Sequence, residues 1–155
     1  MADDTANDVA VLQEATRLLA GVALRSLDIL DGAVTLPQYR VLAVLADLGQ
    51  VRSARVADAL GLEASTVTRL VDRLAAGGYV ARGLDPTNRS AVTLQLTRAG
   101  RQLVRRVVAW RQRELEQMLA HLSLPDKQSL TSGLAQLVAV AGDRYGAMAV
   151  HRLPL

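Results

Sequence analysis

The 155-residue chain contains no cysteine and no phenylalanine, and aromatic residues make up only 3% of it. Without thiols it cannot form disulfides, thiolate zinc sites or iron–sulfur clusters. So few aromatic side chains also give poor support to a stacking platform for single-stranded nucleic acid. The two histidines, His121 and His151, leave little material for acid–base or metal chemistry. The sequence therefore predicts no metal site and no cofactor.

Long hydrophobic runs are missing as well. The longest apolar stretches, such as residues 18–24 and 41–46, fall far short of the roughly 18–20 residues that cross a bilayer. The N-terminus, Met1-Ala-Asp-Asp4, carries two acids where a signal peptide would be basic. Half of the residues are apolar and the length suits one domain with appended helices. We expect a folded, soluble, cytoplasmic protein with no membrane partner.

Charge is distributed unevenly along the chain. Residues 1–35 carry a net charge of −4, residues 36–98 carry +3 and residues 99–155 carry +4. Of the 18 basic residues 17 are arginine, whose planar fork suits phosphates and base edges. A biased genomic base composition would also enrich arginine and alanine, so the positions of the arginines have to decide whether they bind a ligand.

Apolar spacing predicts helices over residues 8–31, 35–48, 53–60 and 63–76. Thr35 and Gln38 form a capping box at the second helix, and Val34 can staple onto Tyr39. The pattern then changes to short strands over residues 79–82 and 91–97, with Val92, Leu94 and Leu96 on one face. Turn-forming residues fill positions 83–90 between them.

Two long helices follow the hairpin. Thr97 can cap the first, and the second begins near Pro125. A helix-turn-helix followed by a β-hairpin is a winged helix, in which the second short helix enters a major groove. The sequence therefore predicts a mainly α (α+β) winged helix-turn-helix with a long helix on the N-terminal side and two on the C-terminal side.

The outer face of helix 63–76 carries groups suited to DNA, namely Ser65, Thr66, Thr68, Arg69 and Arg73. Hydroxyls can bond phosphates or bases, and the two arginines lie one turn apart. The alternative is an ordinary solvated face, in which Asp72 neutralises the arginines between which it lies.

The hairpin tip supplies one more candidate cation. Arg89 lies there beside Asp85 and Asn88, and an arginine on a protruding tip suits a narrow A·T-rich minor groove. The alternative is that Arg89 is only solvated.

Several ordered motifs carry a family resemblance. They are Leu36-Pro-Gln-Tyr-Arg-Val-Leu42, Val56-Ala57 with Leu60-Gly-Leu62, Ser65-Thr-Val-Thr-Arg-Leu-Val-Asp-Arg-Leu74, Gly78-Tyr-Val-Ala-Arg82, Asp85-Pro-Thr-Asn-Arg89 and Leu96-Thr-Arg-Ala-Gly100. Together they resemble the multiple-antibiotic-resistance-regulator (MarR) family over residues 35–100, and the flanking helices match in place and length.

The resemblance implies an obligate homodimer that binds double-stranded DNA as a transcriptional regulator. Residues 1–34 and 101–155 would supply intertwined dimerisation helices and residues 35–100 the DNA-binding domain. Helix 63–76 would read a pseudo-palindromic operator and the wing, residues 83–90, would contact the minor groove. The resemblance also implies repression, less often activation, that a small ligand relieves.

One departure concerns the wing, where the family usually has Asp-Pro-x-Asp-Arg-Arg. Here Asn88 replaces an acid that steadies the wing arginine, and Ser90 removes a second cation. Weaker phosphate contacts at the wing, or steadying by Asp85, are the two alternatives. We expect Arg89→Ala to lower operator affinity and Ser90→Arg to raise it.

Dimerisation also follows from the residues, because a long amphipathic first helix cannot bury its apolar stripe on so small a winged helix. The alternative is that the first and the last two helices pack only within one subunit. Tyr39 and Trp110 are candidates for an apolar effector pocket near the dimer junction, and core packing is the alternative for each. For His121, a cation at a helix C-terminus is a simpler interpretation than a metal ligand.

Two other functional classes remain to be weighed. One is a winged-helix dimer that binds protein and lacks specific DNA binding, against which the retained Arg69, Arg73 and Arg89 argue. The other is an enzyme, for which the sequence offers no Gly-rich phosphate loop, no Ser/His/acid set and only one lysine. We therefore predict a DNA-binding regulator without catalytic residues.

Overall fold

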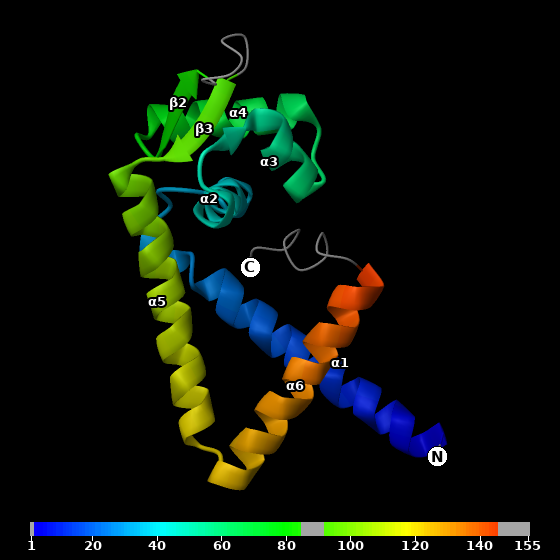
Figure 1. The fold of residues 1–155 in the computed structure, drawn as a ribbon. Coiled ribbons are helices and arrows are strands. Elements are labelled where there is room, and N and C mark those ends of the chain that lie inside the picture. The colour runs from blue at the N-terminus through cyan, green and yellow to red at the C-terminus, as the bar shows by residue number, and fades with distance from the viewer. Residues whose placement is uncertain (1, 85–91, 146–155) are drawn as a thin grey trace.

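A computed structural model describes residues 2–84 and 92–145. Within them the element order is α1 (Ala2–Arg25), the 3-10 helix η1 (Asp28–Leu30), α2 (Leu36–Leu48), β1 (Val51–Arg52), α3 (Ser53–Leu60), α4 (Ala64–Ala76), β2 (Val80–Leu84), β3 (Val92–Leu96), α5 (Arg98–Ala120) and α6 (Leu124–Tyr145). The chain is thus a mainly helical winged helix with a β-hairpin between α4 and α5, as predicted. Figure 1 shows α2, α3, α4 and the strands gathered at one end of the molecule, while α1, α5 and α6 extend from it.

Helix α2 lies at the centre of the core because local signals fix its start and its side chains are apolar. The Thr35 backbone N–H donates to Gln38 Oε1 at 2.7 Å in the predicted capping box, and Val34 and Tyr39 are both buried. Val41 and Leu42 are inaccessible to solvent. Packing against α3, α4, β3 and α5 therefore centres on this one helix.

The sheet has three strands in the order β1-β3-β2, and all pairs are antiparallel. Val80 pairs with Leu96 and Leu84 with Val92, which confirms the hairpin. The sequence analysis missed β1, which pairs with β3 over two residues only. Its prediction of one buried face is partly wrong, because Val92 is 45% exposed next to the hairpin tip while Thr93 is buried.

Helix α1 begins and ends earlier than predicted. It runs from Ala2 to Arg25, because the Ser26 hydroxyl bonds back to the Ala23 carbonyl and Leu27 N–H bonds to Leu24 O in a 3-10 pattern. A short 3-10 helix then leads to Asp31, which has a left-handed φ of 48°. The turn at Asp31-Gly32 therefore ends η1 and not the long helix.

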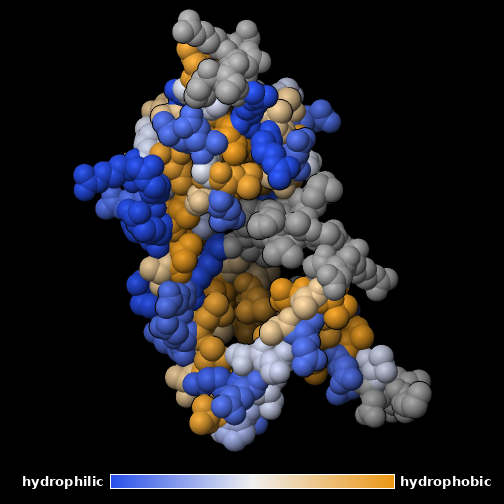
Figure 2. All heavy atoms as spheres, in the orientation of Figure 1, coloured by the Kyte–Doolittle hydropathy of each residue, from blue (hydrophilic) through white to orange (hydrophobic). Residues whose placement is uncertain are grey.

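The long helices leave much apolar surface uncovered. Residues 128–140 of α6 are all exposed, although they include Leu130, Leu134 and Leu137. Leu12 and Leu18 on α1 are exposed in the same way. Figure 1 shows α5 and α6 diverging as the arms of a V, and Figure 2 shows apolar surface along α5 and where α1 and α6 overlap in this view.

Among the described residues, no helix is both long enough and apolar enough to cross a membrane.

Candidate nucleic-acid interface

Helix α4 is held in place by an apolar stripe that leaves its other face free. Val67, Val71 and Leu74 are buried in the core. Helix α3 packs against α4 across a turn in which Gly61 takes a left-handed φ of 63°. This αL residue closes α3 through its N–H to the Ala57 and Asp58 carbonyls, so the two helices form a helix-turn-helix.

The outward face of α4 brings the predicted residues together. Ser65, Thr68, Arg69 and Arg73 are exposed and Thr66 is half-buried. Arg69 Nη2 reaches Thr66 Oγ1 at 3.5 Å, the outer limit of a hydrogen bond, while Thr68 Oγ1 donates to Ala64 O at 2.9 Å. The Thr68 oxygen and the Arg69 guanidinium therefore keep free hydrogen-bonding capacity.

A shallow cleft lies on the same face. It has a volume of about 130 Å³, and Thr66, Arg69, Leu70 and Arg73 line it. Two guanidinium groups and one hydroxyl thus surround a hollow with an apolar base, an arrangement suited to a phosphate or the edge of a base.

Asp72 does not neutralise the two arginines between which it lies in sequence. Its carboxylate instead bonds Arg82 Nη2, on strand β2. Both side chains are about half exposed, so this ion pair adds little stability. The ion pair connects α4 to the base of the hairpin. It also leaves Arg69 and Arg73 without a carboxylate partner among the described residues, so their positive charge is not neutralised.

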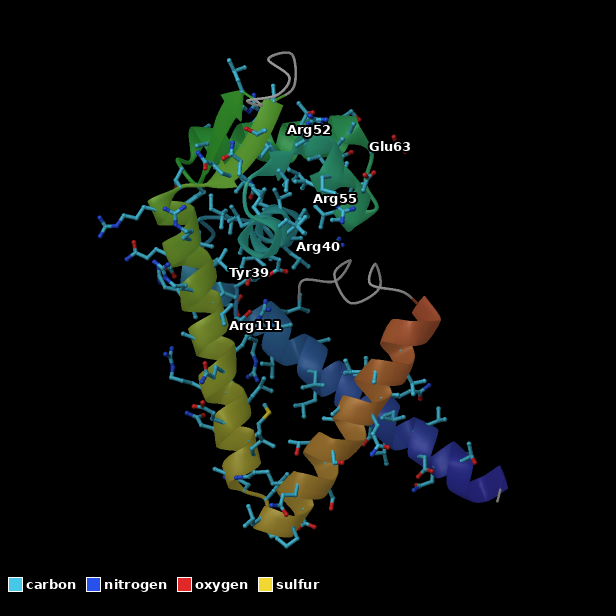
Figure 3. All side chains as sticks on the ribbon, viewed as in Figure 1. Tyr39, Arg40, Arg52, Arg55, Glu63 and Arg111 are labelled. Carbon is cyan, nitrogen blue, oxygen red and sulfur yellow. The ribbon has the colours of Figure 1, made fainter. Side chains whose placement is uncertain are left out.

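Sequence reasoning missed two arginines that belong to this surface. Arg82 was not singled out, because its partner Asp72 lies ten positions away on another element. Arg55 is exposed on α3, the helix that crosses the DNA backbone in helix-turn-helix proteins. Figure 3 shows Arg52 and Arg55 on the α3 side of the domain, near Glu63, the residue that precedes α4. Only the general geometry of the motif could have pointed to Arg55.

The wing can be described only at its base. Strands β2 and β3 carry the hairpin away from the core, and the predicted contacts Asp85, Asn88 and Arg89 lie outside the described residues. The same holds for Ser90.

Tyr39 and Trp110, the two candidates for an effector pocket, have different surroundings. Tyr39 is buried in the core, whereas Trp110 on α5 is half-buried. The Arg111 guanidinium lies over the Tyr39 ring, 5.2 Å from its centroid, and the two side chains point toward each other from α5 and α2 in Figure 3. Burial raises the pKa of Tyr39 and lowers that of Arg111, and their mutual contact partly offsets both shifts.

Arg111 also connects α5 to the end of α1. Its Nε donates to Ser26 Oγ at 2.7 Å, and its Nη2 is buried without an acceptor among the described residues. Arg106, five residues earlier on α5, donates from Nη2 to the Ile29 carbonyl at 3.0 Å. Both arginines of α5 therefore bond the segment that follows α1.

Other titratable groups show no cluster within residues 2–84 and 92–145 that could hold a metal ion. His121, near the end of α5, places Nδ1 2.8 Å from the Gln117 carbonyl.

Comparison with known proteins agrees with this geometry. The family model for MarR proteins matches residues 34–89, which span the helix-turn-helix and the start of the hairpin. A MarR family protein from Bacillus stearothermophilus has the same fold, with a TM-score of 0.78, 25% identity and coverage of 90% of this chain and 96% of that one. The chain belongs to the MarR family.

This MarR-family chain is also similar to two further proteins. The HTH-type transcriptional regulator YfiV of Bacillus subtilis is 31% identical over 104 residues, which cover 67% of this chain. The matched region spans 65% of YfiV, slightly less than two thirds of its length. The crystal structure of RV1404 from Mycobacterium tuberculosis is 30% identical, with a TM-score of 0.82 over 86% of this chain and 92% of that one.

Proposed function

We propose that this MarR-family chain is a homodimeric regulator that binds double-stranded DNA in a sequence-specific manner. Helix α4 would enter the major groove, and the wing, residues 83–90, would contact the minor groove. Ser65, Thr66, Thr68, Arg69 and Arg73 would make the α4 contacts, and Asp85, Asn88 and Arg89 would form the wing contact. Repression of nearby genes, relieved by a small ligand, completes the proposal.

The observation that carries the proposal is the partner of Asp72. Because Arg82 takes up that carboxylate, Arg69 and Arg73 face solvent one turn apart beside a hydroxyl-lined cleft. If the outer face of α4 were only a solvated surface, Asp72 could pair with the neighbouring arginines and neutralise them. FabT of Streptococcus pneumoniae, solved in complex with DNA, shares this fold with a TM-score of 0.73 at 21% identity, so the fold is one that can contact DNA.

The dimer rests on the uncovered helices. Leucines at three- and four-residue spacing on α6 and exposed leucines on α1 would remain in water in a monomer. Burial of apolar surface stabilises by about 25 cal/mol per Å², so contact with a second copy of the chain would bury these leucines favourably. Residues 1–34 and 101–155 would then supply the dimer contacts, and residues 35–100 would form the DNA-binding domain.

The ligand part of the proposal has support at the junction of α1, α2 and α5. There the buried Nη2 of Arg111 has no acceptor within residues 2–84 and 92–145, and the guanidinium lies beside Tyr39. A small acidic effector would satisfy this donor, with Trp110 as a further contact from α5.

The test is fluorescence anisotropy with a duplex from upstream of the chain's own gene and a scrambled duplex, at several salt concentrations. We expect preference for the native duplex together with a steep salt slope, since phosphate contacts alone give the slope without the preference. Arg69→Ala/Arg73→Ala should weaken binding at least tenfold and reduce the slope by about 2.

Arg113→Ala provides the matched control, because it removes an exposed arginine from α5, away from α4. Its affinity for DNA should equal that of the wild type. If the double variant also kept wild-type affinity for both duplexes, the DNA-binding proposal would fail and a protein-binding dimer would replace it.

A further inference from the structure

A second cleft lies where α2, β3 and α5 meet, away from both α4 and Tyr39. Its volume is about 330 Å³, at the lower end of the range of small-molecule sites, about 300–1,000 Å³. The lining residues include Leu45 from α2, Leu96 from β3 and Val104 from α5, all buried. The aliphatic part of the cleft thus belongs to the core and is formed by three elements.

Two arginines of α5 give the cleft its charge. Arg101 and Arg105 lie one turn apart and both line it. Arg101 Nη1 donates to the Leu96 carbonyl at 2.6 Å, which fixes the guanidinium against β3 while its remaining N–H groups stay available. No acidic residue is among the described lining residues, so this cleft presents positive charge without a counterion.

Amides complete the polar lining. Gln50 Nε2 donates one N–H to Thr93 Oγ1 at 3.0 Å, so the Gln50 side chain is held in place and its second N–H remains free to donate. Gln95 of β3 also lines the cleft. An anion bound by the arginines would therefore find amide groups close by, and an apolar body would rest on the aliphatic residues.

We infer that this cleft binds a small aliphatic carboxylate, with its carboxylate on Arg101 and Arg105 and its carbon chain against Leu45, Leu96 and Val104. Arginine favours carboxylates because its planar fork bonds both oxygens. The lining residues include no aromatic side chain on which a ring could stack, which favours an aliphatic body. Since the cleft joins the wing strand β3 to α5, a bound carboxylate would brace the hairpin against that helix.

Three probes separate charge from apolar contact: hexanoate has both, hexanamide has only the tail and acetate has only the charge. Each would be titrated into the ¹⁵N-labelled full chain and followed by NMR. We expect hexanoate to bind at least tenfold more tightly than either control and to shift backbone amides of β3 and of the first half of α5.

Arg105→Gln tests the cleft without disturbing the core, because this side chain is exposed. It should weaken hexanoate binding about tenfold, the usual loss for one charge-assisted hydrogen bond. Gln95→Glu, which adds a carboxylate to the lining, should weaken it by a similar factor. Arg113→Gln removes the same charge from α5 outside the cleft and should leave the affinity unchanged.

The inference is overturned if hexanoate does not bind, if hexanamide or acetate binds equally well, or if Arg105→Gln and Arg113→Gln have the same effect. Shifts confined to residues around Tyr39 and Arg111 would place the ligand elsewhere and overturn it as well. Since no DNA is present in the titration, its outcome is independent of the proposed DNA-binding function.

Discussion

Helices α5 and α6 are both long and amphipathic, yet their apolar residues have different surroundings. In the first half of α5, Leu103, Val104 and Val107 belong to the core. In α6, Leu134 and Leu137 have the same type of spacing and remain in solvent. The sequences of the two helices do not explain this difference. Only α5 runs alongside the winged helix, whose core covers its apolar residues. An apolar stripe therefore predicts burial without saying which chain will cover it.

The largest effect on stability is expected in the buried core around α2. Leu42→Ala removes a side chain with no solvent exposure and should lower the free energy of unfolding by about 2–5 kcal/mol. Leu48→Ala on the same helix is the control and should cost less than about 1 kcal/mol, because Leu48 is 37% exposed. Urea denaturation at fixed protein concentration measures both. Equal losses would contradict the placement of the core around α2.

Substitutions in the exposed apolar stripe of α6 should weaken dimer association rather than folding. Leu134→Asp places a charge in the α6 stripe and should raise the dimer dissociation constant about a hundredfold, or more, while the winged helix stays folded. Sedimentation equilibrium and far-UV circular dichroism report the two properties separately. Gln136→Asp adds the same charge off the stripe and should leave the dimer intact. A monomeric wild type would refute the proposed dimer directly.

The boundary between the two regions contains Gly100, in the first turn of α5. A Cβ atom at this position would lie 2.2 Å from the Tyr79 carbonyl oxygen, a backbone atom that already accepts the Thr97 N–H. Gly100→Ala should therefore destabilise the fold by about 1–3 kcal/mol. Gly133→Ala, on α6 with open space around its Cβ, should be neutral or slightly stabilising. Thermal unfolding distinguishes them, and a neutral Gly100→Ala would contradict this contact.

The smallest effect on stability is expected at the ion pair between α4 and β2. Asp72→Asn should change the free energy of unfolding by less than about 1 kcal/mol, because both partners are half exposed. It should nevertheless strengthen non-specific DNA binding by roughly twofold, since it removes an anion and releases Arg82. Asp28→Asn, on η1, is the control for charge alone in anisotropy measurements. Weaker binding by Asp72→Asn would show that Asp72 positions α4 rather than repelling DNA.

Local signals made much of the fold predictable. The Thr35–Gln38 box and the Thr97 cap predicted the starts of α2 and α5, and Thr97 Oγ1 does accept the Gly100 N–H at 3.1 Å. Strand β1 was missed because two residues have no periodicity, and its pairing with β3 depends on residues about 40 positions later. The end of α1 was misplaced because the hydroxyl of Ser26 competes for the helical carbonyls, which apolar spacing does not reveal.

The candidate site was also predictable only in part. Helical periodicity alone places Ser65, Arg69 and Arg73 on one face, so their proximity was predictable. The pairing of Asp72 with Arg82 was not predictable, because it depends on a tertiary contact between α4 and β2. The cleft of Arg101 and Arg105 was equally hidden, since its other walls come from α2 and β3.

Helix α5 has a mechanical consequence, because its contacts with the winged helix and with the end of α1 lie before its last turns. Its last core residue is Val107 and Arg111 still bonds Ser26, so the remaining 9 residues to Ala120 extend about 14 Å further, at about 1.5 Å per residue. A tilt of roughly 10° at the anchored end would move the far end by about 2–3 Å over that length. The helix is thus a lever arm, and a small displacement at the winged helix becomes a large one at the turn to α6.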